Sequence, residues 1–206
     1  LVSLARQVGL VAGAHFSTRK LHVAIADATR SVVAETSLPL ALDHRHDAEL
    51  DRLSLLLGDM VEGLGGSLSD LLAVGLAIPA PVDPRTSIIS TPGLLPGWDG
   101  VDIARSLSAR IGRPVHVDSE ANLGALAEAR EGAARGASSS VYVTVGHSIS
   151  AGLLVDGELF RGASGRTGQI GHMTIDEHGA LCRCGNRGCL ETVAAGPALL
   201  AGFSEA

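Results

Sequence analysis

The stretch Gly165–Glu191 reads G-R-T-G-Q-I-G-H-M-T-I-D-E-H-G-A-L-C-R-C-G-N-R-G-C-L-E, and it decides the prediction of the fold. It contains every cysteine of the chain, downstream of a histidine: His172, Cys182, Cys184 and Cys189. Three thiols and one imidazole make a tetrahedral zinc set. Two alternatives are three unrelated free thiols and a disulfide, which would leave one thiol over. The compact spacing favours zinc.

The expected zinc site is structural. Four protein ligands complete the tetrahedron and leave no position for a water molecule. Structural zinc binds with about 10–16 kcal/mol, enough to hold a loop rigidly. The metal is therefore expected to fix Gly168–His172 and Glu191 against a ligand pocket.

The pattern G-x-x-G-H followed by C-x-C-G-x-x-G-C-x-E resembles the signature of the ROK family of sugar kinases and sugar-responsive transcriptional regulators. Ala73–Pro84, Pro92–Asp102 and Val117–Glu128 share this resemblance. It implies an α/β, actin-like ATPase (ribonuclease-H-like) fold with two lobes. Residues 1–118 would form the N-terminal lobe, and residues 119–206 would begin a second lobe that carries the zinc loop (165–191). Relatives continue beyond this loop, so the second lobe is expected to be truncated.

Hydrophobic patterning agrees with an α/β order. Strands are expected at Val8–Ala14, Leu21–Asp27, Val32–Ser37, Leu71–Ile78, Val115–Asp118, Val141–Val145 and Ala151–Val155. Helices are expected at Asp47–Leu64, Val101–Ile111, Ala121–Glu131, Cys189–Ala195 and Pro197–Glu205. This order is what a two-lobed actin-like fold would give.

Composition narrows the classes of function. The 206 residues are 46% hydrophobic with a net charge of −6, and no apolar run is long enough to span a membrane. We expect a cytoplasmic protein, where thiols stay reduced for zinc. Sixteen Lys and Arg against twenty-two Asp and Glu, with only 2% aromatic residues, predict no DNA-binding face. DNA would be bound only through a module outside these residues.

Two glycine-rich nucleotide loops of the kinases are altered in this chain. The resemblance places the D-x-G-G-T turn on Ala12–Ser17, where Ala12 occupies the Asp position. It places G-T-G-I-G-A-G on Gly146–Gly152, where Ser148 and Ser150 replace glycines. Added Cβ atoms occupy the space that phosphates need. ATP and magnesium are therefore not expected as cofactors.

The catalytic base is altered as well. Kinases of the family carry Asn-Asp in a V-E-N-D-A-N run, and here the run is V-D-S-E-A-N, with Glu120 at the base position. Its extra methylene displaces the carboxylate by about 1.5 Å, and a displacement of about 1 Å can cost on the order of 10²-fold in rate. Glu120 is expected to be catalytically inactive. A structural interpretation of the same pair is that Ser119 caps the following helix and Glu120 favours its positive N-terminal end, which does not exclude contact with a ligand.

The resemblance also implies a sugar site. Carried over one position at a time, the family's sugar contacts fall on Ser119, Glu120, Gln169, His172 and Glu191. Each has a polar group that can meet a hydroxyl. Trp98 is expected to pack at the lobe junction.

Three functions are compatible with these observations. The favoured one is the ligand-sensing domain of a ROK-type transcriptional regulator that binds a sugar or sugar phosphate, expected to be a homo-oligomer. The second is an ATP-dependent sugar kinase with divergent loops. The third is a protein-interaction module built on the zinc loop.

Overall fold

The structure, a computed structural model, describes residues 9–204 and divides them into two compact units. The first contains the described residues up to Ile78 together with residues 85–89 and 96–118. The second contains residues 79–84, 90–95 and the chain from Ser119 onward. Val8 and Glu205, which the sequence places at the ends of a strand and a helix, lie outside the described residues.

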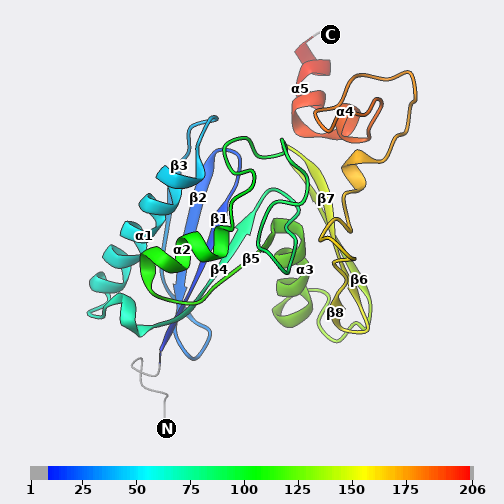
Figure 1. Cartoon of the computed structure of the whole chain (residues 1–206). Coiled ribbons are helices and arrows are strands. Elements are labelled where there is room, and N and C mark those ends of the chain that lie inside the picture. The colour runs from blue at the N-terminus through cyan, green and yellow to red at the C-terminus, as the bar shows by residue number, and fades with distance from the viewer. Residues whose placement is uncertain (1–8, 205–206) are drawn as a thin grey trace. The chain divides into compact units, whose positions relative to one another are not determined.

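The first unit is built on a five-stranded sheet with the order β3-β2-β1-β4-β5 (Figure 1). The strands are β1 (Leu10–Phe16), β2 (Lys20–Ala26), β3 (Val32–Pro39), β4 (Leu71–Ile78) and β5 (Val115–Ser119). β1 pairs antiparallel with β2 and parallel with β4, and β2 pairs antiparallel with β3. The parallel pairing requires a crossover, which the intervening helix supplies.

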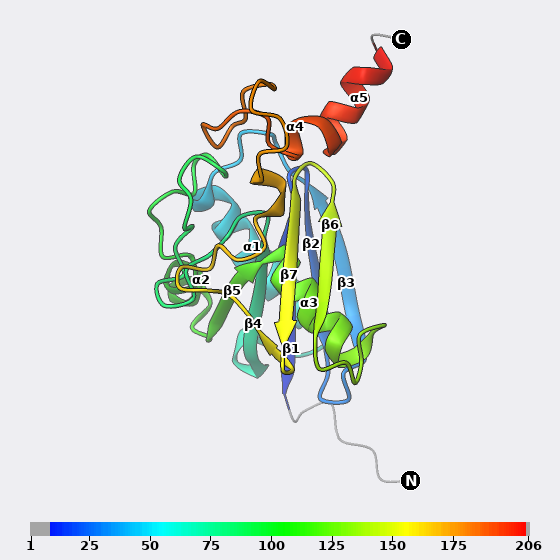
Figure 2. The same cartoon turned by 90° about the vertical axis from the view of Figure 1, so that its right-hand side faces the viewer.

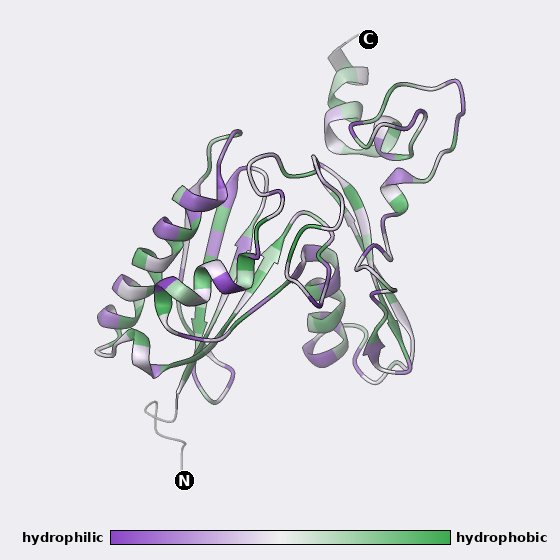
Figure 3. Ribbon diagram, in the orientation of Figure 1, coloured by the Kyte–Doolittle hydropathy of each residue, from purple (hydrophilic) through white to green (hydrophobic). Residues whose placement is uncertain are grey.

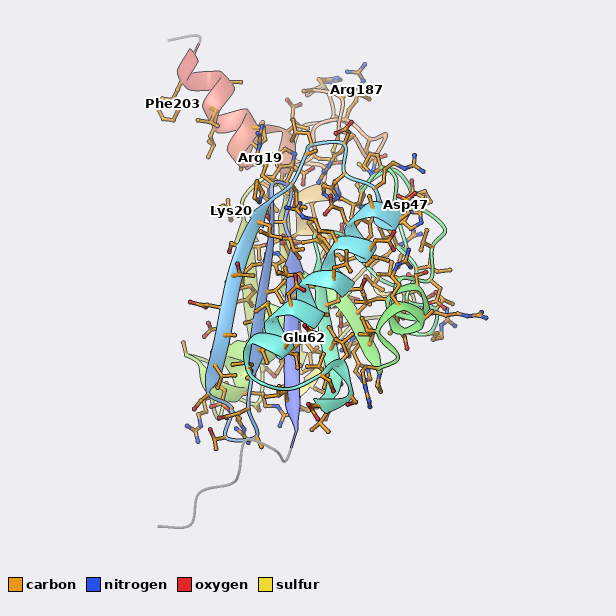
Figure 4. The ribbon with its side chains drawn as sticks, turned by 90° about the vertical axis from the view of Figure 1, so that its left-hand side faces the viewer. Arg19, Lys20, Asp47, Glu62, Arg187 and Phe203 are labelled. Atoms are coloured by element: carbon orange, nitrogen blue, oxygen red, sulfur yellow. The ribbon has the colours of Figure 1, made fainter. Side chains whose placement is uncertain are left out.

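Two helices pack together in this unit, α1 (His46–Gly63) and α2 (Ile103–Ile111), and Figure 1 shows them on the same face of the sheet. α1 buries a stripe at helical spacing: Leu50, Leu53, Leu57 and Val61. Its outward face is mixed in the hydropathy colouring of Figure 3: Asp47 and Glu62, which Figure 4 labels, are polar, whereas Leu55 is an exposed apolar residue. A short 3-10 helix, η2 (Leu68–Asp70), leads into β4.

Trp98 lies fully buried inside the first unit. Its ring contacts Phe16, with 5.0 Å between the ring centroids, and its indole N–H donates to Nδ1 of the buried His44 at 3.2 Å. The packing role predicted for Trp98 is therefore confirmed. Its contacts with Phe16 and His44 lie in the core of this unit.

The second unit combines a three-stranded antiparallel sheet with α3 (Glu120–Glu131). The strands are β6 (Ser140–Val145), β7 (Ile149–Val155) and β8 (Glu158–Leu159), in that order. α3 packs on β6 and β7, and Figure 2 shows it behind this hairpin. Gly152 permits the close packing, because a Cβ there would lie 2.1 Å from the Ala121 carbonyl oxygen.

The remaining elements of this unit follow the long loop after β8. They are the 3-10 helix η3 (Ile170–His172), the short helix α4 (Glu191–Ala194) and α5 (Gly196–Ser204). The helix predicted at Cys189–Ala195 is thus shorter, and the one predicted from Pro197 begins one residue earlier. Among the described residues, no helix is both long and apolar enough to cross a membrane.

Candidate functional site

A pocket in the second unit brings together all five residues predicted to contact a sugar. Ser119, Glu120, Gln169, His172 and Glu191 line it. The five residues come from three separate segments of the chain, so only folding places them around one space.

The start of α3 supplies Ser119 and Glu120. The Ser119 hydroxyl accepts a hydrogen bond from the Asn122 backbone N–H at 3.2 Å, which caps the helix. Glu120 is the first residue of the helix, where a negative charge favours the positive end of the helix dipole. The capping predicted for this pair is confirmed, and both side chains also border the pocket.

Two glycines position Gln169 and His172. Gly168 has φ +90°, and a Cβ there would lie 1.8 Å from the Ala151 carbonyl oxygen. A Cβ on Gly171 would lie 2.3 Å from the Ile149 carbonyl oxygen. The loop can therefore lie directly against the backbone of β7, where the Ala151 N–H donates to the Gly168 carbonyl at 2.7 Å. The G-x-x-G-H spacing thus has a packing reason.

A cluster of thiols and imidazole adjoins the pocket and shares His172 with it. The candidate ligand atoms of His172, Cys182, Cys184 and Cys189 all lie within 4.8 Å of one another. The His172 Nδ1 lies 3.5 Å from the Cys182 sulfur, and the sulfurs of Cys184 and Cys189 are 3.7 Å apart. The edges of a tetrahedron with zinc at its centre measure about 3.6 Å and about 3.8 Å for such pairs. The cluster fits a tetrahedral metal.

The backbone turn after Cys182 brings the sulfurs together. The Cys182 N–H donates to the Asn186 carbonyl at 2.7 Å, and the Gly185 N–H donates back to Cys182 at 2.9 Å. Burial raises the pKa of the Cys189 thiol to about 12, and the neighbouring sulfurs add to the effect. Burial acts to raise the pKa of the Cys184 thiol too, but hydrogen bonds from Asn186 and Cys182 lower it on balance.

Glu191 is buried, and both of its carboxylate oxygens are occupied. One accepts from Arg183 Nε at 2.9 Å. The other accepts from the Ile149 backbone N–H at 3.2 Å and from a second Arg183 nitrogen at 3.4 Å. The carboxylate is therefore held in one orientation at the pocket wall.

Several lining residues were not singled out as ligand contacts from the sequence. These are Pro79, Ala80, Pro81, Leu94, Ser148, Ile149, Ser150 and Arg183. Ser148 and Ser150 stand where the kinases have glycines, so this replacement was a usable signal. The position of Arg183 was a second signal, because a residue between two metal ligands in the sequence must lie next to the metal site.

The segments matched to the nucleotide loops have ordinary strand and hairpin structure. Ala12–Phe16 lies within β1, and the chain turns only at Ser17–Lys20, where the Ser17 N–H donates to the Lys20 carbonyl at 2.8 Å. Gly146–Ser148 forms the turn between β6 and β7. Ser150 lies inside β7, with its hydroxyl 2.8 Å from that of Thr144.

Comparison with known proteins identifies the family and supports the fold. The ROK family matches residues 11–205. A putative xylose repressor of Caldicellulosiruptor sp. is 32% identical over 97% of this chain and 50% of its own length. A glucokinase of Halalkalibacterium halodurans is 37% identical over 67% of this chain and 42% of its own. The ROK hexokinase structure from Thermus thermophilus superimposes with a TM-score of 0.76 and 32% identity, covering 95% of this chain and 63% of the hexokinase.

The fold and the site thus define a ROK-type α/β protein. The chain belongs to the ROK family and has its actin-like ATPase fold. It spans about half the length of the curated relatives that it matches.

Proposed function

We propose that these residues form the ligand-sensing part of a ROK-type transcriptional regulator and that the pocket of the second unit binds a sugar or a sugar derivative. The observation that carries the proposal is the convergence of Ser119, Glu120, Gln169, His172 and Glu191 on one pocket. Carboxylates, an amide, a hydroxyl and an imidazole offer the donors and acceptors that a polyhydroxyl ligand needs.

Zinc in the cysteine cluster would hold the pocket in shape. Nδ1 of His172 faces the Cys182 sulfur and is the nitrogen suited to the metal. Nε2 then remains for a ligand hydroxyl, because a metal-bound imidazole still offers its second nitrogen. With three cysteines and one histidine the coordination is complete, so the metal would be structural.

Regulation is favoured over catalysis by the altered nucleotide segments. Ser148 and Ser150 carry side chains at positions where the kinases have glycine, and both border the pocket. Glu120 replaces the aspartate of the kinases at the base position. Similarity to a putative xylose repressor over nearly the whole chain supports the same interpretation. The proposal includes assembly into a homo-oligomer. It also includes DNA recognition, through a module other than these 206 residues, whose net charge is −6.

An ATP-dependent sugar kinase is the second candidate. Similarity to a glucokinase and to a ROK hexokinase favours it. Glu120 would then be the general base, and general-base catalysis typically contributes about 10²–10⁴-fold to a rate.

Ligand binding by the intact protein separates these candidates. We would measure the melting temperature with D-xylose, D-glucose, N-acetylglucosamine and their phosphates, with and without Mg-ATP, while following ADP release. At least one sugar should raise the melting temperature, because a ligand at 100 times its Kd stabilises the folded state by about 2.7 kcal/mol. No sugar-dependent ADP should appear. Sugar-dependent ADP would establish the kinase, and no response to any sugar would favour the interaction module.

A Glu191→Gln variant locates the binding in this pocket. The neutral amide keeps an acceptor for the Ile149 N–H but loses the charge-assisted hydrogen bonds to a ligand, each worth about 1.5–3 kcal/mol. Sugar affinity should fall by about tenfold or more in a titration. Glu177→Gln is the matched control, since Glu177 is an exposed residue of the same loop. Equal affinities of both variants and the wild type would place the ligand elsewhere.

A further inference from the structure

Arg183 occupies a distinctive place in the pocket wall. It lies between two members of the cysteine cluster, and its side chain is 35% exposed, whereas that of Glu191 is 9% exposed. Its Nε and a terminal nitrogen both donate to the Glu191 carboxylate. This fork joins a partly exposed cation to an almost buried anion.

The formal charges around the pocket depend on this pair. Two carboxylates, Glu120 and Glu191, line it. Apart from the His172 imidazole, Arg183 is the one basic side chain among the described residues that border it. With the arginine in place the pocket has one excess negative charge, and without it the excess would be two. The arginine therefore sets how strongly the pocket attracts a cation.

The geometry points to Arg183 as a specificity-determining residue that holds Glu191 in position and tunes the pocket for neutral sugars over amino sugars. This inference rests on the proposed function, because it concerns the ligand of the same pocket. A neutral hydroxyl donates to the carboxylate whether or not the guanidinium is present. An ammonium group on the ligand is repelled by Arg183 and attracted by the carboxylate that Arg183 neutralises.

The position of the arginine makes this role specific. Arg187 lies in the same cysteine-rich loop, but its side chain donates to the Gly179 carbonyl at 3.4 Å and not to Glu191. It does not border the pocket. Figure 4 labels it at the outer end of the loop, which makes it a natural control.

The test compares D-glucose with protonated D-glucosamine, which differ at one substituent. We would titrate both sugars into the zinc-loaded intact protein and into the Arg183→Gln, Arg183→Lys and Arg187→Gln variants. The ratio of the two affinities should shift by about two- to fivefold toward glucosamine in Arg183→Gln, as expected for a partly exposed charge pair. Taking a ratio cancels losses of affinity that come from disturbing the loop.

The other variants decide between charge and structure. Arg183→Lys keeps the charge without the fork, so its ratio should stay near that of the wild type, and Arg187→Gln should leave the ratio unchanged. An unchanged ratio in Arg183→Gln, or an equal shift in Arg187→Gln, would overturn the inference while the sugar site stands. Failure of both sugars to bind the wild type would overturn the inference alone, whereas failure of every sugar in the panel above would overturn sugar recognition at this pocket as well.

Discussion

Gly171 shows how much a single position contributes to the pocket. Its absent side chain leaves room for the Ile149 carbonyl oxygen, which a Cβ would approach to 2.3 Å. The next residue, His172, belongs both to the pocket and to the cysteine cluster. A displacement of the backbone here would move both sites at once, because the loop lies on β7.

A Gly171→Ala substitution should therefore destabilise the protein and weaken sugar binding. The added Cβ would push the loop that contains Gly171 away from β7. Such overpacking typically lowers the free energy of unfolding by about 1–3 kcal/mol. Gly58→Ala is the control, because Gly58 lies inside α1 with no atom within 4 Å of an added Cβ. It should stabilise the protein by about 0.5–1 kcal/mol. Urea unfolding of both variants measures the difference, and a Gly171→Ala protein as stable as the wild type would contradict the close approach.

The loop between η3 and α4 has little regular secondary structure and little apolar packing of its own. Residues 173–190 contain two isolated β-bridges, Thr174 with Cys189 and Leu181 with Arg187, and no helix or longer strand. Such a segment buries few apolar side chains; Met173, Ile175 and Leu181 are exposed. A metal would supply the cohesion that packing does not.

We predict that the intact protein contains one zinc ion per chain and loses stability when it is removed. Metal analysis should find the ion, and a chelator should lower the melting temperature and abolish the response to sugar. His172→Ala should lose the metal, whereas His178→Ala, which changes an exposed histidine of the same loop, should retain it. Wild-type protein without metal but with full stability would refute a structural zinc.

At the scale of the whole molecule, a buried histidine links stability to pH. Burial lowers the pKa of His44 below its usual value of 6.5, although the charges of Glu49 and Asp43 act in the opposite direction. Neutral His44 accepts the indole hydrogen bond of Trp98. As the pH falls through about 6.5, His44 therefore takes up a proton in the unfolded chain before it does so in the folded chain.

Stability should consequently fall as the pH drops below about 6.5, by at most about 1.4 kcal/mol per pH unit from this group. The stability that neutral His44 contributes is fully present above the pKa of His44 in the unfolded chain. It is lost as the pH falls and no longer changes below the pKa of His44 in the folded chain. His44→Gln keeps an acceptor for Trp98 but cannot titrate, so its free energy of unfolding should decline less between pH 7.5 and 5.5. His178→Gln should decline as the wild type does. Identical pH profiles for His44→Gln and the wild type would show that His44 titrates normally in the folded protein.

Local sequence already determined much of this protein. Apolar patterning in the sequence predicted the strands β1 to β7 within a few residues. It also predicted the amphipathic helix α1. Both predictions were possible because strand and helix periodicity are local properties of the chain. The ribonuclease-H-like fold followed from resemblance, and the ROK family is confirmed. The cluster of His172 with three cysteines was predicted from spacing alone, since its members are close in the chain.

Only the tertiary structure decided how separate segments meet. It showed that Ser119 and Glu120 at the start of α3 share a pocket with Gln169 and with Glu191, and that Arg183 pairs with that last carboxylate. It also placed Trp98 in the core of the first unit, against His44 and Phe16. The physical reason is that these residues are far apart in the chain and meet only when larger pieces pack. The pocket forms because α3 and the loop around Gly168 and Gly171 both pack on β7, and the Trp98 contacts form because apolar rings are buried together. No local pattern in the sequence encodes such packing.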